Sequence, residues 1–158
     1  MDDFAPIEQL AGNLLRSLSA QERRSLLRKM ARTIRASQSQ RIGRQQNPDG
    51  SAFAARRAQE GGGRLRRRGQ IKRAAMFRKL RSTKFLKSGS TDSEAWIGFT
   101  GRAATIARVH QEGLTDAVTK GGRKVRYARR ELLGLSEPEC DLALDMLLDH
   151  VTGRALVE

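Results

Sequence analysis

The sequence predicts an α+β protein in which long N-terminal helices and a C-terminal helix flank a small antiparallel sheet, with an extended basic loop or arm. Apolar residues recur at helical spacing near both ends of the 158-residue chain. Short runs around Trp96 and Val125 have the composition of strands. Residues 51–70 have almost no apolar content beyond alanine, Phe53 and Leu65. We therefore expect a single domain over residues 1–158, with residues 47–70 as a projecting basic loop.

Two helices are expected at the N-terminal end, separated by a capping box. The first is indicated by apolar residues at helical spacing: Phe4, Ile7, Leu10, Ala11, Leu14, Leu15 and Leu18. Ser19 and Glu22 have capping-box spacing, which ends one helix and starts the next. We expect the second helix to reach about Gln46 and to stop before Pro48, because proline forces the preceding residue out of the α region.

The stretch Asn47-Pro48-Asp49-Gly50 suits a type I turn with glycine at its end. A basic, polar segment follows, with the flexible joint Gly61-Gly62-Gly63. Such a sharp turn before a loop without core residues is typical of a segment that reaches a partner.

The second half is expected to alternate between helices and strands. We expect a helix over 71–85, a break at 87–90, a strand over 94–99, a helix over 102–112 capped by Gly113, a strand over 123–127, and a last helix from the capping box Ser136–Glu139 to Gly153.

Positive charge is concentrated in the middle of the chain. The formal net charge is +14, and thirteen Lys and Arg residues but a single acid, Glu60, lie between Arg56 and Lys87. A field of this size attracts polyanions or acidic protein surfaces. A solvated basic surface without a dedicated ligand is the simpler alternative.

The residues that could carry catalysis or bind a metal form no known pattern. His110, Cys140 and His150 match no zinc-ligand spacing, and the chain has no nucleophile-elbow or phosphate-loop motif. His110 beside Glu112 could act as a general base, although a charged imidazole near a helix end is the simpler interpretation. We expect no enzyme activity, cofactor or metal. A single cysteine excludes an intrachain disulfide, and no apolar run reaches the roughly 20 residues that span a bilayer.

Nucleic-acid binding is the main alternative to a protein-assembly role. The candidate contacts to DNA phosphates are Arg66, Arg67, Arg68, Lys72 and Arg73. Aromatic residues are too few nearby to form a stacking platform, so such binding would be non-specific and salt-dependent.

Four stretches together resemble the phage virion morphogenesis family, the S-type tail-completion proteins of contractile-tailed phages and prophages. They are "RIGRQQNPDGSAFAARR", "IKRAAMFRKLRSTKFLK", "ARVHQEGLTD" and "YARRELLGLSEPE". The resemblance runs in matching order from about Leu10 to Leu148. The family commonly has a proline where this chain has Ala128, so the backbone there is less constrained.

The resemblance implies a non-enzymatic protein of the virion neck, assembled in the host bacterial cytoplasm, that acts in tail completion and head–tail joining. It also implies a homo-oligomeric ring, most often hexameric, around the DNA channel. The implied partners are further copies, neck, tail-terminator or tail-tube proteins, and DNA without sequence preference. We expect a subunit or ring-to-ring interface at Asn47, Pro48, Asp49, Gly50, Phe53, Arg56, Arg57, Arg64, Arg66, Arg67 and Arg68.

Overall fold

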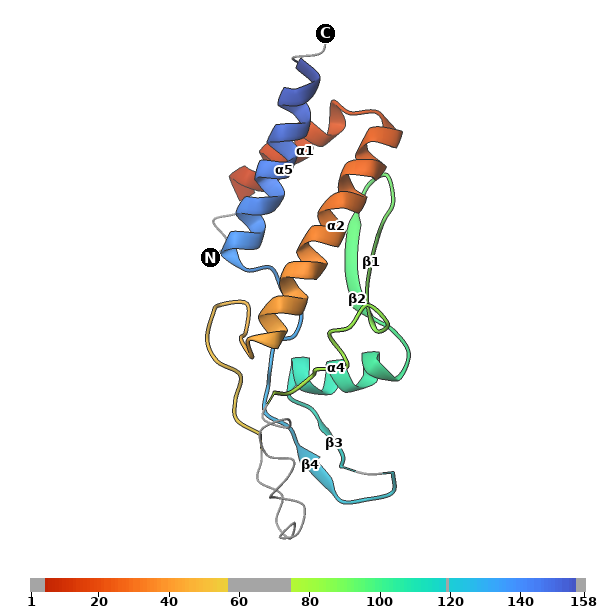
Figure 1. Cartoon of the computed structure of the whole chain (residues 1–158), viewed down its shortest axis with the longest axis vertical. Helices are drawn as coiled ribbons and strands as arrows, with labels where there is room; N and C mark the ends of the chain where they lie inside the picture. The colour runs from red at the N-terminus through yellow and green to blue at the C-terminus, as the bar shows by residue number, and fades with distance from the viewer. Residues whose placement is uncertain (1–4, 57–74, 119, 156–158) are drawn as a thin grey trace. The chain divides into compact units, whose positions relative to one another are not determined.

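The computed structural model describes residues 5–56, 75–118 and 120–155, and in these ranges it is a mixture of helices and short strands (Figure 1). The elements in chain order are α1 (Ala5–Arg16), α2 (Ala20–Gly43), β1 (Leu86–Ser90), β2 (Ala95–Phe99), α4 (Arg102–Glu112), β3 (Thr115–Ala117), β4 (Lys124–Arg126) and α5 (Glu137–Ala155). The α+β prediction is confirmed. The predicted basic loop lies largely outside the described residues.

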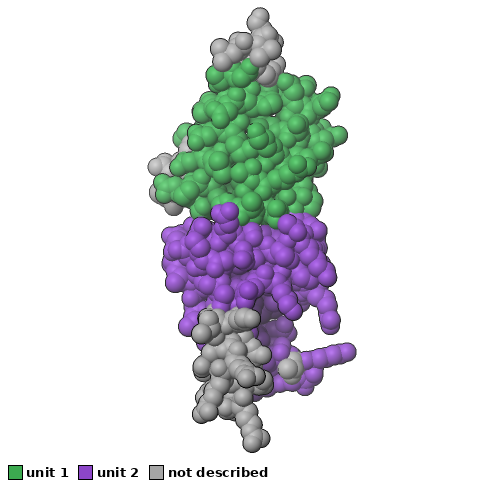
Figure 2. Space-filling model, in the orientation of Figure 1, with its two compact units in different colours: residues 1–37, 88–97, 135–158 green, residues 38–87, 98–134 purple. Residues whose placement is uncertain are grey.

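The chain divides into two compact units (Figure 2). Unit 1 comprises residues 1–37, 88–97 and 135–158, and unit 2 comprises residues 38–87 and 98–134. Each unit has its own hydrophobic cluster of buried residues. The single domain expected over the whole chain stays a prediction.

Unit 1 is built from helices that bury leucines against one another. Leu18, Leu26 and Leu147 form its buried cluster, and α1 packs against α5. The predicted capping box at the start of α2 is confirmed. The Ser19 backbone N–H donates to Glu22 Oε2 at 2.8 Å, and the Glu22 N–H donates to Ser19 Oγ at 3.3 Å.

Unit 2 has a separate cluster made by Ile42, Phe53, Ala107 and Leu132. These residues come from the end of α2, the segment after it, helix α4 and the segment before α5. The partly buried Met76, Phe77, Leu80 and Phe99 pack against this cluster. The core of unit 2 therefore joins segments that are far apart in the sequence.

The strands form two separate two-stranded sheets, β1 with β2 and β3 with β4. β3 and β4 are antiparallel, with Thr115 opposite Arg126 and Ala117 opposite Lys124. The strands predicted over 94–99 and 123–127 are confirmed with slightly shorter bounds. β1 corrects the predicted break at 87–90. Gly89 permits this strand, because a Cβ there would lie 2.5 Å from the indole of Trp96.

Two helix predictions differ from the structure. α2 ends at Gly43 rather than near Gln46, because Gln45 has a left-handed φ of 59°. The described part of the helix predicted over 71–85 forms turns instead, and Phe77 has a left-handed φ of 65°. A residue in that conformation interrupts a right-handed helix.

The last two helices follow their sequence signals closely. α4 has the predicted bounds, and Gly113 adopts the predicted left-handed C-cap conformation, with φ 65°. α5 begins with Glu139 Oε2 accepting the Ser136 N–H at 3.0 Å, as the second capping box predicted. It continues to Ala155, two residues beyond the predicted end at Gly153.

Candidate functional site

The Asn47–Gly50 stretch forms a tight turn, as predicted, and it closes a short hairpin. The Gly50 N–H donates to the Asn47 carbonyl at 3.0 Å, and the Asn47 N–H donates to the Ser51 carbonyl at 2.8 Å. Gly50 has φ 84°, which is accessible to glycine at little cost. These bonds match a three-residue hairpin loop with a glycine bulge.

Gln45 shapes the approach to this hairpin. The Gln46 N–H bonds the Arg41 carbonyl, and the Gln45 N–H bonds the Ile42 carbonyl, which is a Schellman ending without glycine. The Gln45 side-chain amide pairs with the backbone of Met76, donating at 3.0 Å and accepting at 2.7 Å. These bonds compensate for the left-handed conformation that a non-glycine residue adopts at some cost.

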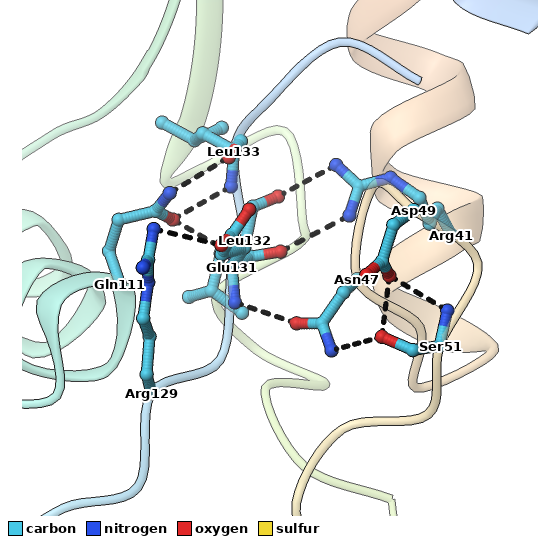
Figure 3. Close-up of polar contacts among 9 residues, drawn as sticks. All are labelled: Arg41, Asn47, Asp49, Ser51, Gln111, Arg129, Glu131, Leu132 and Leu133. Carbon is cyan, nitrogen blue, oxygen red and sulfur yellow. Dashed lines mark hydrogen bonds and ion pairs between the residues drawn. The ribbon is translucent and has the colours of Figure 1, made fainter. Parts of the chain in front are cut away.

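The Asn47 side chain joins the hairpin to the segment before α5 (Figure 3). Its Oδ1 accepts the Glu131 N–H at 2.9 Å, while its Nδ2 donates to Ser51 Oγ at 3.1 Å. Asp49 Oδ1 accepts from both the N–H and the hydroxyl of Ser51. The hydroxyl bond, and then the backbone bond, lower the pKa of the Asp49 carboxyl. The turn is thus held rigid by its own side chains.

Two longer side chains complete a polar clamp, which we define as Arg41, Asn47 and Gln111 around residues 131–134. Arg41 is 4% exposed, and its guanidinium donates to four backbone carbonyls: those of Gln46, Glu131, Leu132 and Gly134. Gln111 accepts from the N–H groups of Leu132 and Leu133 and donates to the Leu133 carbonyl (Figure 3). Because this segment has no regular partner strand, side chains satisfy its backbone groups.

The clamp positions the start of the basic stretch through Arg130. Its guanidinium donates to the Ala54 carbonyl at 2.7 Å and to the Ala55 carbonyl at 2.8 Å. Burial first, and Arg56 second, lower the pKa of Arg130. Arg56 is exposed and directly follows the fixed residues. The chain therefore leaves the hairpin at a defined point.

The expected interface residues have different surroundings. Asp49, Gly50 and Arg56 are exposed, whereas Pro48 is partly buried. Phe53 is 7% exposed and belongs to the core, with its ring 5.7 Å from that of Phe77. The remaining expected residues, for the interface and for DNA phosphates, lie outside the described residues: Arg57, Arg64, Arg66, Arg67, Arg68, Lys72 and Arg73.

His110 is enclosed rather than presented to a substrate. Its ring makes edge contacts with Phe77 and Tyr127, and its Nδ1 lies 3.2 Å from Arg130 Nη1. Burial first, then Arg130 and Arg56, lower the pKa of His110 to about 4. The imidazole is therefore neutral near pH 7 and accepts from Arg130, which corrects the charged imidazole of the simpler interpretation. Glu112 pairs with Arg108.

The described residues do not assemble a catalytic constellation. Ser25, Asp149 and His150 line one hollow in unit 1, but none of the hydrogen bonds found in the described part joins them. A nucleophile needs a hydrogen-bonded base, which in turn needs an orienting partner. The hollow beside α4 is lined mostly by apolar groups and the Arg108–Glu112 pair. Within the ranges described, no cluster of His, Cys, Asp and Glu could hold a metal ion.

None of the described helices combines the length and apolar character that a bilayer crossing demands.

The acids of unit 2 are used locally, while several of its basic groups face outward. Its acids in the described residues are Asp49, Glu112, Asp116 and Glu131. Asp116 accepts the Ala117 N–H, and Glu131 pairs with Arg129 at 2.8 Å. The chain around β4 carries exposed Lys and Arg side chains: Lys120, Arg123, Lys124 and Arg126. Unit 2 therefore presents a basic surface beyond the stretch that the sequence singled out.

The described part of unit 2 thus combines a fixed turn with a basic surface around β4. The chain belongs to the phage virion morphogenesis family, whose model matches residues 2–152. It is 34% identical, over 153 residues, to tail completion protein S of Escherichia phage P2, covering 96% of this chain and 99% of that protein. No solved structure matches it significantly. The resemblance found in the sequence is confirmed.

Two of the clamp residues, Arg41 and Gln111, were not among the site residues expected from the sequence. Arg41 lies in the polar last turns of the second expected helix, and such a helix end either projects into solvent or contacts a partner. The helical spacing could have predicted the burial of Arg41. The buried face of α2 continues through residues three or four apart, which are Ile34, Gln38, Arg41 and Ile42. The role of Gln111 could not be predicted in this way, because its hydrogen-bond partners are backbone groups, which every residue has.

Proposed function

We propose that this chain is a structural virion protein that completes the phage tail and stabilises its joining to the head. The observation that carries this proposal is the near full-length relation to a tail completion protein. Full coverage of both chains supports a shared role for the whole chain rather than for one shared module. Assembly takes place in the host cytoplasm, and the mature location is the neck or tail of the virion.

The second part of the proposal is assembly as a homo-oligomeric ring, with six subunits, around the DNA channel. Large apolar side chains on the surface of the described residues support burial against neighbours. They include Leu10, Trp96, Ile106, Val118, Leu135 and Leu148, which are 40–57% exposed. Aromatic residues such as Trp96 often anchor interfaces. A repeated head-to-tail contact closes into a ring when its rotation permits.

The third part concerns the turn and the basic stretch. We assign Asp49, Gly50 and Arg56, with the arginines from Arg57 to Arg68, to an interface with a neighbouring subunit or ring. Asn47 and Phe53 support this surface from within unit 2, through the Glu131 N–H and the core. A rigid turn reduces the conformational entropy that docking removes.

Two measurements test this function. In a phage that carries this gene with an early stop codon, we expect lysates with filled heads and separate tails, and purified protein should restore infectious particles. Mass photometry of the purified chain should give one species of six times 17.6 kDa. Normal head–tail joining without the chain would refute the role, and a monomer at micromolar concentration would refute the ring.

DNA binding is the second candidate function, supported by the net charge of +14 and the basic surface of unit 2. It predicts affinity without sequence preference, whose logarithm falls linearly with the logarithm of salt concentration. Removing charge at Lys124 and Arg126 should then reduce that slope. Absence of binding at about 0.15 M salt would rule it out.

A further inference from the structure

Helix α2 carries a basic stripe on the side away from its buried residues. Arg24, Arg28 and Arg32 are all exposed and spaced four residues apart. Four residues advance about 40° around a helix and about 6 Å along it. The three guanidinium groups therefore lie on one face, while Leu26 and Leu27 are buried on the other. We call these three residues the basic stripe.

Helix α5 carries an acidic stripe with the same spacing. Glu137, Asp141 and Asp145 are exposed and also four residues apart. Leu147, on the opposite side of the helix, is 2% exposed and belongs to the same buried cluster as Leu26. Both stripes thus belong to unit 1. Each lies on a helix whose leucines pack into the buried cluster of that unit. We call these three residues the acidic stripe.

Neither stripe is neutralised by an ion pair in the described part of the chain. The Arg108–Glu112 and Arg129–Glu131 ion pairs lie in unit 2 and involve no residue of either stripe. Like charges four residues apart on a helix repel and destabilise it. A helix with three of them in a row is stabilised when a surface of opposite charge covers it. The two stripes offer that surface to each other in sign, number and spacing.

We propose that the basic stripe of one copy docks against the acidic stripe of the next copy in the ring. This inference rests on the ring of the proposed function and identifies the contact that builds it. In a closed ring the basic stripe of each copy meets one neighbour and its acidic stripe meets the other, which makes the contact head-to-tail. Charge complementarity fixes the register, since three charges repeat at the same interval on each side.

A second copy fits this face better than DNA does. DNA would contact the basic stripe but would be repelled by the acidic stripe of the same unit. DNA binding would also leave Glu137, Asp141 and Asp145 without a partner. Lys29 and Asp149 are excluded from the stripes because they line one hollow within the same copy.

Charge reversal on full-length protein tests the pairing by mass photometry. The first variant carries Arg28→Glu with Arg32→Glu, and the second carries Asp141→Lys with Asp145→Lys. Each variant alone has two stripes of one sign, so we expect loss of the ring and at least about a hundredfold weaker self-association. The variant with all four changes should regain the ring, and so should an equal mixture of the two variants, as alternating subunits.

The control carries Arg123→Glu with Lys124→Glu, which makes the same change of charge as the first variant on exposed residues of unit 2. It should keep the wild-type mass. A wild-type ring that survives both reversals, or a control that loses the ring equally, would overturn the stripe pairing and leave the ring proposal standing. Failure of the four-change variant and of the mixture to recover, with native circular dichroism, would overturn it as well. A monomeric wild type would overturn both proposals.

Discussion

Replacing Gln111 with alanine should weaken unit 2 strongly, although this side chain is polar and carries no charge. The amide makes three hydrogen bonds of 2.8–3.0 Å to the backbone of Leu132 and Leu133. Each such bond contributes about 1 kcal/mol net, and an unpaired buried group costs about 1–3 kcal/mol. Leu132 is fully buried, so water cannot replace the lost partners easily. We expect a loss of about 3 kcal/mol.

The assay is thermal unfolding followed by circular dichroism at one fixed protein concentration, because self-association shifts the midpoint. For a chain of this length, about 3 kcal/mol corresponds to a fall in Tm of roughly 6–12 °C. Gln111→Glu keeps both acceptor contacts but replaces the donor to the Leu133 carbonyl with a carboxylate oxygen, which repels that carbonyl, so it should also lower Tm. Thr105→Ala, an exposed change on the same helix, is the control.

A Tm for Gln111→Ala within about 1 °C of the Thr105→Ala value would refute the contribution of these three hydrogen bonds.

Two further predictions concern the same unit. Gly134→Ala should cost about 1–3 kcal/mol, because φ is 146° and the new Cβ would lie 2.8 Å from Pro48 Cγ; urea unfolding measures it. The pKa of His110 is lowered from 6.5 to about 4, so the unfolded chain takes up the proton first. Its contribution to stability is present above about pH 6.5 and is lost as pH falls towards 4, and His110→Gln should flatten that fall.

The matched control for Gly134 is Gly98→Ala, where a Cβ meets no atom within 4 Å. Equal losses at the two glycines would contradict the steric argument. For His110, the readout is the difference in urea midpoint between pH 7 and pH 4.5. An unchanged difference in His110→Gln would show that another group titrates in that range.

Much of the fold follows from local signals. The bounds of α4 agree with the sequence prediction, because its alanines, its buried Val109 and the glycine after it all indicate the same helix. In both capping boxes the serine N–H donates to the glutamate carboxylate, since this bond depends on residues three apart. The Asn47–Gly50 turn is equally local, since the hydrogen bond that closes it joins the Gly50 N–H to the Asn47 carbonyl, three residues earlier. Family membership could also be predicted from the sequence, because four short stretches resemble the family and follow one another in the matching order.

Other features depended on contacts between segments that are distant in the sequence. The residues before β1 have a helical pattern, yet Met76 pairs with the Gln45 amide and Phe77 takes a left-handed φ. Packing of Phe77 against Phe53 and His110 outweighs the local preference. Propensity is a weak influence that tertiary contacts override.

The sequence by itself determined the helices that carry caps, the turn, the concentration of charge and the family. Only the tertiary structure decided that Arg41, Asn47 and Gln111 hold residues 131–134 in place. Capping boxes and turns are satisfied within a few residues, so their partners are visible in the sequence. The clamp satisfies backbone groups up to 93 residues away, and every residue has such groups, so no residue type marks the partner in advance.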